Sequence, residues 1–269
     1  MSSRLNNFWE MHRKGKYLKE EKLDLIKSVK DGFNMFPKEL AKLKNEIVHF
    51  CRQDAVCGTY HNDYEILWKF DKPESLHDWI VTCDSDHNEG KSTADFIINK
   101  NKKAFFYGNL DVETPKDGIT KNSGYCNISS PHNMLSFGRV KPYDWSAYTH
   151  LLMKVRGDGR TYNLVLNMNR YWDVQWNDAY FFLLYTRGGP YWQLSKIPLS
   201  KFFLSSKGRV QDKQEAIQKG DILRFGITIA DSYPGPFGLE IDFIGLVNDT
   251  THKSEFDYEM YEVAPYLMS

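Results

Sequence analysis

The sequence has little cysteine and no long apolar run, and each shortage excludes a class of protein. Four cysteines in 269 residues are too few for the disulfide framework of a small secreted scaffold. The spacing of Cys51 and Cys57 fits neither a zinc knuckle nor a Cys-x-x-Cys redox site, so we expect reduced thiols. The longest strongly apolar run, from Tyr180 to Tyr185, is far shorter than the roughly 20 residues that span a bilayer. Any membrane attachment is therefore expected to be peripheral.

Charge of one sign is not in excess either, because 35 basic residues balance 35 acidic ones. Without a global basic field, nucleic acid is not expected as a partner. The first 56 residues carry 12 basic and 8 acidic side chains and contain no apolar core of a secretory signal. Glu10, Glu20 and Glu21 depart from the acid-poor composition of a mitochondrial presequence. We expect that the sequence starts after a removed presequence or carries an unusual one.

Catalytic and cofactor motifs are also missing. We find no Gly-x-Ser-x-Gly elbow and no phosphate-binding Gly-x-Gly-x-x-Gly, so we expect no catalytic residue and no cofactor. Glu240 and Asp242 alternate with apolar residues, which indicates the outer face of a strand rather than an acid and base pair. The run from Asp84 to Gly90 has the oxygen ligands of a calcium loop, but Glu89 occupies the position where an EF-hand has glycine. We predict an acidic turn and no metal site.

Two amphipathic helices are predicted in the basic N-terminal arm. The first covers residues 17–31 and is expected to stop at Gly32. The second is expected to begin at Pro37, followed by Leu40, Leu43 and Ile47 at helical spacing. These apolar stripes can pack on the main domain, or they can dock on a partner or a membrane surface.

Beyond residue 63, short strands with period-two alternation dominate and turn clusters separate them, which predicts a β-sandwich. The predicted strands are 65–70, 93–98, 104–107, 124–128, 151–156, 162–168, 179–186, 191–197, 223–229 and 239–245. Gly157-Asp158-Gly159 tolerates positive φ, so we expect the strands on either side of it to pair as a hairpin.

Several separate motifs resemble the complex I intermediate-associated protein family. They are Tyr143 to Tyr148, Val155 to Tyr162, Tyr191-Trp192, Ile197 to Leu199, Phe202 and Pro236 to Asp242, in the family's order. The resemblance covers roughly residues 64–248, in the usual size range of one domain. The matching residues to which we assign a structural role are Trp145, Arg156, Gly157, Asp158, Gly159, Arg160, Tyr162, Trp192, Pro198 and Phe237.

The resemblance implies an all-β fold, a galactose-binding-domain-like jelly-roll β-sandwich with an N-terminal helical arm. It also implies a non-enzymatic assembly factor of the mitochondrial matrix, peripheral to the inner membrane, that binds intermediates of respiratory complex I on the membrane-arm side. The implied partners are complex I subunits and other assembly factors, namely an acyl-CoA dehydrogenase-like protein and a signalling adaptor. We divide the chain into the basic helical arm (1–62), the sandwich (63–250) and an acidic aromatic tail (251–269).

An aromatic stretch inside the sandwich offers a second candidate for binding. Tyr171, Trp172 and Trp176 lie among amides and acids, a composition that suits core packing, protein contact or sugar binding. With the stripe of Leu40, Leu43 and Ile47, they are our candidate partner-binding residues. The alternative function is a carbohydrate-binding module of galactose-binding-like fold.

Overall fold

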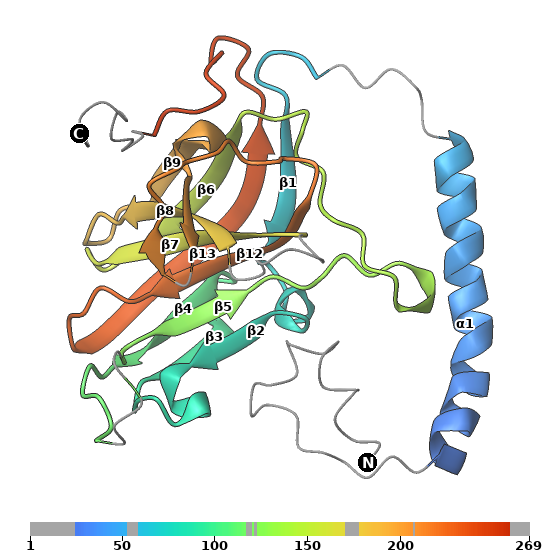
Figure 1. Ribbon diagram of the computed structural model, residues 1–269, viewed down its shortest axis with the longest axis horizontal. Coiled ribbons are helices and arrows are strands. Elements are labelled where there is room, and N and C mark those ends of the chain that lie inside the picture. The colour runs from blue at the N-terminus through green and yellow to red at the C-terminus, as the bar shows by residue number, and fades with distance from the viewer. Residues whose placement is uncertain are drawn as a thin grey trace, which may run out of the picture.

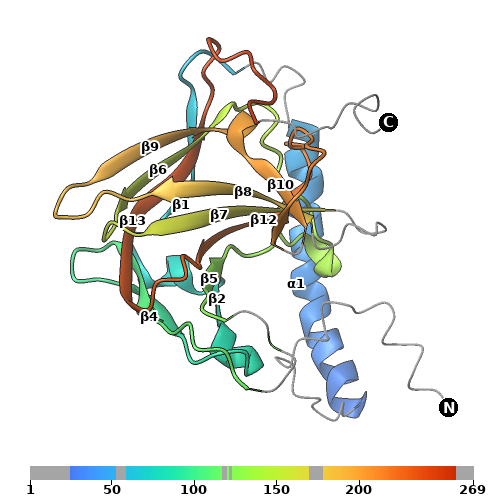
Figure 2. The ribbon, with the colours of Figure 1, turned by 60° about the vertical axis from the view of Figure 1, so that its left-hand side comes forward.

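A computed structural model describes residues 25–52, 59–116, 120, 123–169, 178–206 and 208–258. Two antiparallel sheets pack face to face, and the helix α1 (Leu25–Arg52) stands beside them (Figure 1 and Figure 2). The predicted β-sandwich with an N-terminal helical arm is confirmed. Among the described residues, no helix combines the length and the apolar character needed to cross a bilayer.

The two sheets contain six and seven strands, and all of their pairings are antiparallel. The first sheet follows the order β3 (Thr93–Ile98), β4 (Ala104–Leu110), β13 (Gly235–Val247), β6 (His150–Arg156) and β9 (Gln193–Pro198), with β1 (Tyr64–Lys69) also on β13. The second follows the order β11 (Arg209–Val210), β10 (Phe203–Ser206), β8 (Asp178–Tyr185), β7 (Thr161–Met168), β12 (Ile222–Ile229), β5 (Cys126–Ser129) and β2 (Ile80–Cys83). Short 3-10 turns η2 (Pro73–Leu76), η3 (Asp84–His87), η4 (Ser136–Gly138) and η5 (Leu199–Lys201) connect strands.

One hydrophobic core fills the space between the sheets. The alternating residues Leu151, Met153 and Val155 of β6 are fully buried, and so are Leu164 and Leu166 of β7 in the opposite sheet. Period-two patterns on both sheets therefore point into the same core, as the alternation in the sequence predicts.

Register shifts occur in β1, β12 and β13, and the sequence pattern missed those in β12 and β13. In β13 the register slips between Ile241 and Phe243, so the buried face moves to Ile244 and Phe243 is only half-buried. In β12 the register shift between Ile222 and Arg224 places Ile222 in the core instead of Leu223. An extra residue in one strand reverses which side chains face inward, so a simple alternation across the bulge is wrong.

The expected hairpin at Gly157 is also wrong. The strand β6 pairs with β13 and β9 in the first sheet, whereas β7 pairs with β8 and β12 in the second. The segment from Arg156 to Thr161 therefore carries the chain from one sheet to the other. Period and turn residues predict a reversal, but they do not specify which edges pair. Here both edges of each strand are occupied by other strands.

The N-terminal arm also differs from the prediction, because one helix replaces two. The helix α1 runs through Gly32 and Pro37 without a break. Proline removes one backbone donor and destabilises a helix interior, but flanking turns with good helix formers can carry the helix across it. Residues 17–24 of the first predicted helix lie outside the described residues.

Candidate functional site

The corner between β6 and β7 is held by the charged residues of the family-like motif. Arg160 donates from Nε to Asp231 Oδ2 (2.8 Å) and from Nη2 to Asp231 Oδ1 (2.5 Å). It also bonds the carbonyls of Tyr233, Gly235 and Pro236. Burial would raise the pKa of Asp231, but the hydrogen bonds from Arg160 and the Tyr233 backbone, together with the charge of Arg160, outweigh it and hold that pKa below its usual value. Arg160 thus ties the corner to the loop before β13.

Asp158 makes the matching connection from the other side of the corner. Its carboxylate accepts hydrogen bonds from the N–H groups of Gly238 (2.8 Å) and Arg160 (3.0 Å) and from the Tyr162 hydroxyl (3.2 Å). Tyr162 is fully buried, and burial followed by the charge of Asp158 raises the pKa of its phenol. The polar groups of this corner therefore satisfy one another.

The other motif residues lie at several places in the sandwich. Trp145, Phe237 and Tyr162 are buried in the core. Trp192 is half-buried on the outer face of the first sheet, under the cations of Lys154 and Arg156. The remaining motif contacts are the Arg156 ion pair with Glu240 (2.5 Å) and the backbone pairing of Pro198 with His150. Asp242 on the same face pairs with Lys103 and Lys154.

The helix α1 meets the sandwich at η4. The Glu46 carboxylate accepts hydrogen bonds from the N–H (2.5 Å) and the hydroxyl (3.1 Å) of Ser136, and it pairs with Arg139 (2.6 Å). Glu39 accepts the N–H of Phe137 (2.7 Å). These hydrogen bonds lower the pKa of Glu46, chiefly through the Ser136 backbone. Two acids spaced two helical turns apart therefore attach α1 to one loop.

The predicted apolar stripe on α1 stays largely in solvent. Leu40 and Ile47 are 44% and 55% exposed and Phe50 is 77% exposed, while Leu43 is half-buried. Figure 1 shows this helix standing clear of both sheets, with the η4 loop reaching toward it. The other candidates, Tyr171, Trp172 and Trp176, lie outside the described residues.

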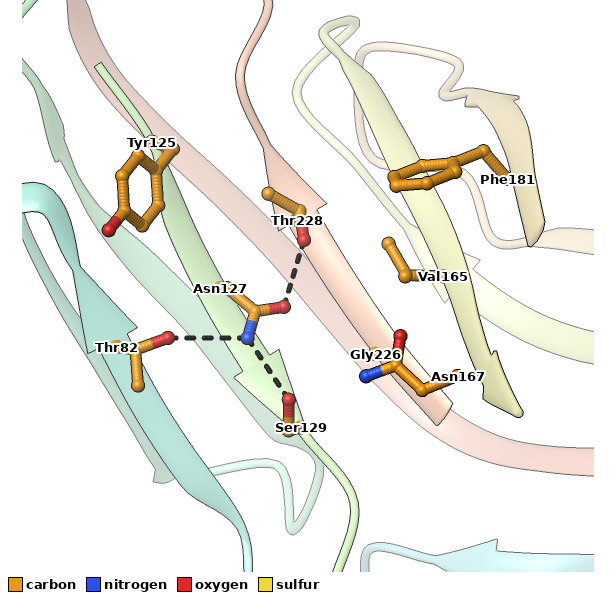
Figure 3. Close-up of a pocket in the computed structure, with 9 residues that line it drawn as sticks. All are labelled: Thr82, Tyr125, Asn127, Ser129, Val165, Asn167, Phe181, Gly226 and Thr228. Carbon is orange, nitrogen blue, oxygen red and sulfur yellow. Dashed lines mark hydrogen bonds between the residues drawn. The ribbon is translucent and has the colours of Figure 1, made fainter. Parts of the chain in front are cut away.

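A shallow hollow of about 310 Å³ lies on the outer face of the second sheet (Figure 3). Asn127 stands at its centre and donates to Thr82 (3.2 Å) and Ser129 (3.0 Å), while its carbonyl accepts from Thr228 (2.8 Å). The lining residues are Thr82, Tyr125, Asn127, Ser129, Val165, Asn167, Phe181, Gly226 and Thr228. The Asn127 amide is thus committed to its neighbours.

The acidic turn at residues 84–90 is organised by a buried carboxylate. Asp84 accepts hydrogen bonds from the N–H (2.8 Å) and the hydroxyl (3.0 Å) of Ser92 and from the N–H of Gly124 (2.7 Å). A Cβ at Gly90 would lie 2.0 Å from this carboxylate. Asp84 thus joins three chain segments through neutral donors. Across the described segments, no group of three or more His, Cys, Asp or Glu side chains could hold a metal.

A serine, histidine and aspartate cluster, which sequence reasoning missed, holds the start of the tail. The Ser200 hydroxyl lies 2.9 Å from His252 Nε2, and Asp257 bonds the same hydroxyl. Asp257 is 3.6 Å from Nε2 of His252, whereas a catalytic triad places the acid on Nδ1. The Asp257 N–H also bonds the Ser200 carbonyl (3.0 Å). The geometry attaches residues 252–258 to the sandwich rather than activating a nucleophile.

The cysteines are placed differently from one another. Cys83 and Cys126 are buried, free and directly opposite each other on β2 and β5, while Cys51 is exposed on α1. Burial contributes to a raised pKa of the Cys126 thiol, after the larger effect of its hydrogen bond to Cys83. Cys57 lies outside the described residues.

Comparisons with known proteins point in one direction. A family model described as complex I intermediate-associated protein 30 (CIA30) matches residues 68–241. The chain is 42% identical over 265 residues to "Complex I intermediate-associated protein 30, mitochondrial" of Drosophila melanogaster, covering 97% of this chain and 90% of that protein. The protein of the same name from Mus musculus is 42% identical over 226 residues, covering 81% of this chain and 67% of that protein.

A family 11 carbohydrate-binding module from Clostridium thermocellum aligns with 72% of this chain and 99% of its own. The TM-score of that alignment is 0.49, and the sequence identity is 13%.

Proposed function

The chain belongs to the complex I intermediate-associated protein 30 family, and from this we propose that it takes part in the assembly of mitochondrial respiratory complex I. We propose further that it binds assembly intermediates on the membrane-arm side. In this role it is a scaffold without catalytic activity or cofactor, in the matrix and peripheral to the inner membrane.

The observation that carries this proposal is the apolar stripe of α1. Leu40, Ile47 and Phe50 face solvent on a helix that two acidic residues attach to the sandwich. Fully burying an exposed large aliphatic or aromatic side chain is worth about 1.5–3 kcal/mol, and these partly exposed residues gain the fraction of it that their exposed area represents. A helix with an uncovered stripe suits docking into a hydrophobic groove of a partner. We assign this contact to complex I subunits.

The aromatic stretch of Tyr171, Trp172 and Trp176 is proposed as a second contact, since Trp and Tyr are enriched among interface hot spots. We propose that other assembly factors, an acyl-CoA dehydrogenase-like protein and a signalling adaptor, share the complex. The residues of the motif are proposed to support the fold. Their charged groups are bonded within the fold, Arg160 to Asp231 and Asp158 to the N–H of Gly238.

Complementation of cells that lack their own copy tests the function. Blue-native separation of their mitochondria should reveal accumulated membrane-arm intermediates and little mature complex I, and the chain should restore the complex. A Leu40→Glu and Ile47→Glu double variant should fail, because charge opposes burial of the stripe. Ala41→Glu with Asn45→Glu is the matched control, since this pair adds the same charge at two exposed positions of the same helix.

The two outcomes that contradict the proposal differ. Normal complex I in cells without the protein contradicts the assembly role itself. Full rescue by the double variant contradicts only the assignment of α1. The alternative, a carbohydrate-binding module, predicts that the purified protein binds a glycan array and captures no complex I subunit.

A further inference from the structure

A partly buried arginine, Arg224, lies on the outer face of the second sheet. Arg224 of β12 is directly opposite Asn167 of β7, and both lie on the face that carries Gly226 and Thr228. Gly226 and Asn167 line the hollow, so Arg224 lies next to two of its lining residues on the same face of the sheet. Phe225 and Ile227, which alternate with these residues, point into the core.

The guanidinium of Arg224 lacks the contacts that other arginines make. Its Nε is buried and has no hydrogen-bond partner, and within the described part of the chain no acid pairs with it. Burial alone lowers the pKa of Arg224, whereas the pKa of Arg160 is raised by its bonds to Asp231. Three other arginines each contact a carboxylate within 2.6 Å: Arg139 with Glu46, Arg156 with Glu240 and Arg160 with Asp231.

Keeping such a group costs stability, because a buried charge without a counterion loses its hydration without compensation. Arginine stays protonated in proteins, so the group cannot escape this cost by losing its proton. The guanidinium of Arg224 can therefore gain a counterion by forming an ion pair with an anion from another molecule.

The neighbours of Arg224 select the kind of anion. Asn167, directly opposite Arg224, is neutral, and so are Asn127, Ser129 and Thr228 on the same face, so these residues add no charge to that of the guanidinium. One guanidinium matches one carboxylate through two parallel N–H to oxygen bonds. Phosphate recognition, in contrast, commonly gathers several cations or a row of backbone N–H groups.

We propose that Arg224 anchors an aspartate or glutamate side chain of a partner protein on the outer face of the second sheet. The open hollow beside it receives the residues that flank this acid. The inference rests on the proposed function for its partner, a complex I intermediate, and it adds an acidic anchor separate from the apolar contact of α1.

The isolated protein provides the first test, using a hexaglutamate peptide as the probe at low ionic strength. The amide resonances of Gly226 and Asn167 should shift on titration, and Arg224→Met should weaken the binding at least 10-fold. Arg209→Met, at an exposed position on β11 of the same sheet, should leave it unchanged. Inorganic phosphate and cardiolipin vesicles serve as competing probes. Arg224-dependent binding of either one without hexaglutamate overturns the proposal.

Thermal stability provides the second test, and the expected sign is unusual for a change at a partly buried residue. Arg224→Met should raise the melting temperature of the free protein by about 2–4 °C, because it removes an unpaired charge while keeping the length of the side chain. A lower melting temperature would mean that the guanidinium is bonded within the fold, which overturns the proposal.

Complementation then connects the site to the partner. Arg224→Met should co-migrate with intermediates at least 10-fold less than the wild type, and Arg209→Met should co-migrate normally. Equal co-migration of the Arg224 variant overturns the anchor while leaving the assembly role intact. If the wild type does not co-migrate at all, the assembly role fails, and the hexaglutamate result still decides the chemistry of the site.

Discussion

Single residues decide the geometry of the corner between the two sheets. A Cβ at Gly157 would lie 2.3 Å from the Cβ of Thr186. The Thr186 side chain cannot easily move away, because its hydroxyl donates a hydrogen bond to the Arg160 carbonyl (2.7 Å) and accepts one from the Gly159 N–H (3.1 Å). At Gly159 the constraint is different, since its φ of +95 lies in the region that favours glycine.

Gly157→Ala should therefore destabilise the protein by about 1–3 kcal/mol, the usual cost of overpacking. Chemical denaturation measures the loss. Gly220→Ala is the control, because its new Cβ would approach no atom closer than 3.4 Å, and it should change stability by less than about 0.5 kcal/mol. In combination with Thr186→Ala the cost should be less than additive. Strict additivity would exclude the steric explanation.

A buried histidine makes stability depend on pH. Burial, assisted by the charge of Lys196, lowers the pKa of His150 to about 4. In the unfolded chain His150 takes up a proton near pH 6.5, whereas in the folded protein it stays neutral until about pH 4. The free energy of unfolding therefore has its full value above pH 6.5 and decreases as the pH falls toward 4, because protonation favours the unfolded chain. His252 and Asp249 also act on His150, with opposite signs.

We expect the melting temperature to fall between pH 6.5 and about 4, and His150→Gln should make this fall smaller. An unchanged slope in the His150 variant would argue that other groups titrate in this range.

At the scale of elements, periodicity identified where most strands lie but not which strands pair. Thr93–Ile98 was predicted to the residue, because alternation and turn residues mark it clearly. The strand Ile80–Cys83 was missed, since the adjacent apolar residues Ile80 and Val81 break the alternation that marks a strand. The partners of β6 and β7 depend on edges contributed by distant segments, which a local pattern does not contain.

The same limit applies to the candidate sites. Spacing alone revealed the stripe of Leu40, Leu43 and Ile47, because a helix fixes which residues share a face. Arg224 gave no signal, because in the sequence it is one more polar residue in an alternating strand. Its lack of a counterion is a property of the folded chain, as is the placement of Asp84 among neutral donors.

The attachment of α1 to η4 leads to a prediction at this scale. Glu39→Ala with Glu46→Ala should release the helix from the loop while keeping it helical, because alanine favours helix. The amides of Ser136 and Phe137 should then exchange hydrogen faster, since they lose their carboxylate acceptors. Mass spectrometry of peptides spanning the loop measures this change, with Lys44→Ala as the control. Unaltered exchange would show that the loop does not depend on the helix.

For the molecule as a whole, the two proposed contacts are of different chemistry. The stripe on α1 offers apolar area, which provides binding energy, whereas a single buried guanidinium offers direction and selectivity. A partner that satisfies both must present a hydrophobic groove and an acid at a fixed separation. Many proteins offer one of these features, and few offer the two in the right relation.

The long strand β13 has a consequence for the order in which the chain can fold. Its 13 residues pair with β4, β6 and β1, yet they come from the last part of the described chain. Tyr64 at the start of β1 meets Val247, so the first sheet stays open until nearly the whole polypeptide has been made. During synthesis or passage through a translocation pore, the backbone N–H and C=O groups along the edges of the earlier strands remain unpaired until β13 is available. We therefore expect the nascent chain to depend on chaperones until its C-terminal portion emerges.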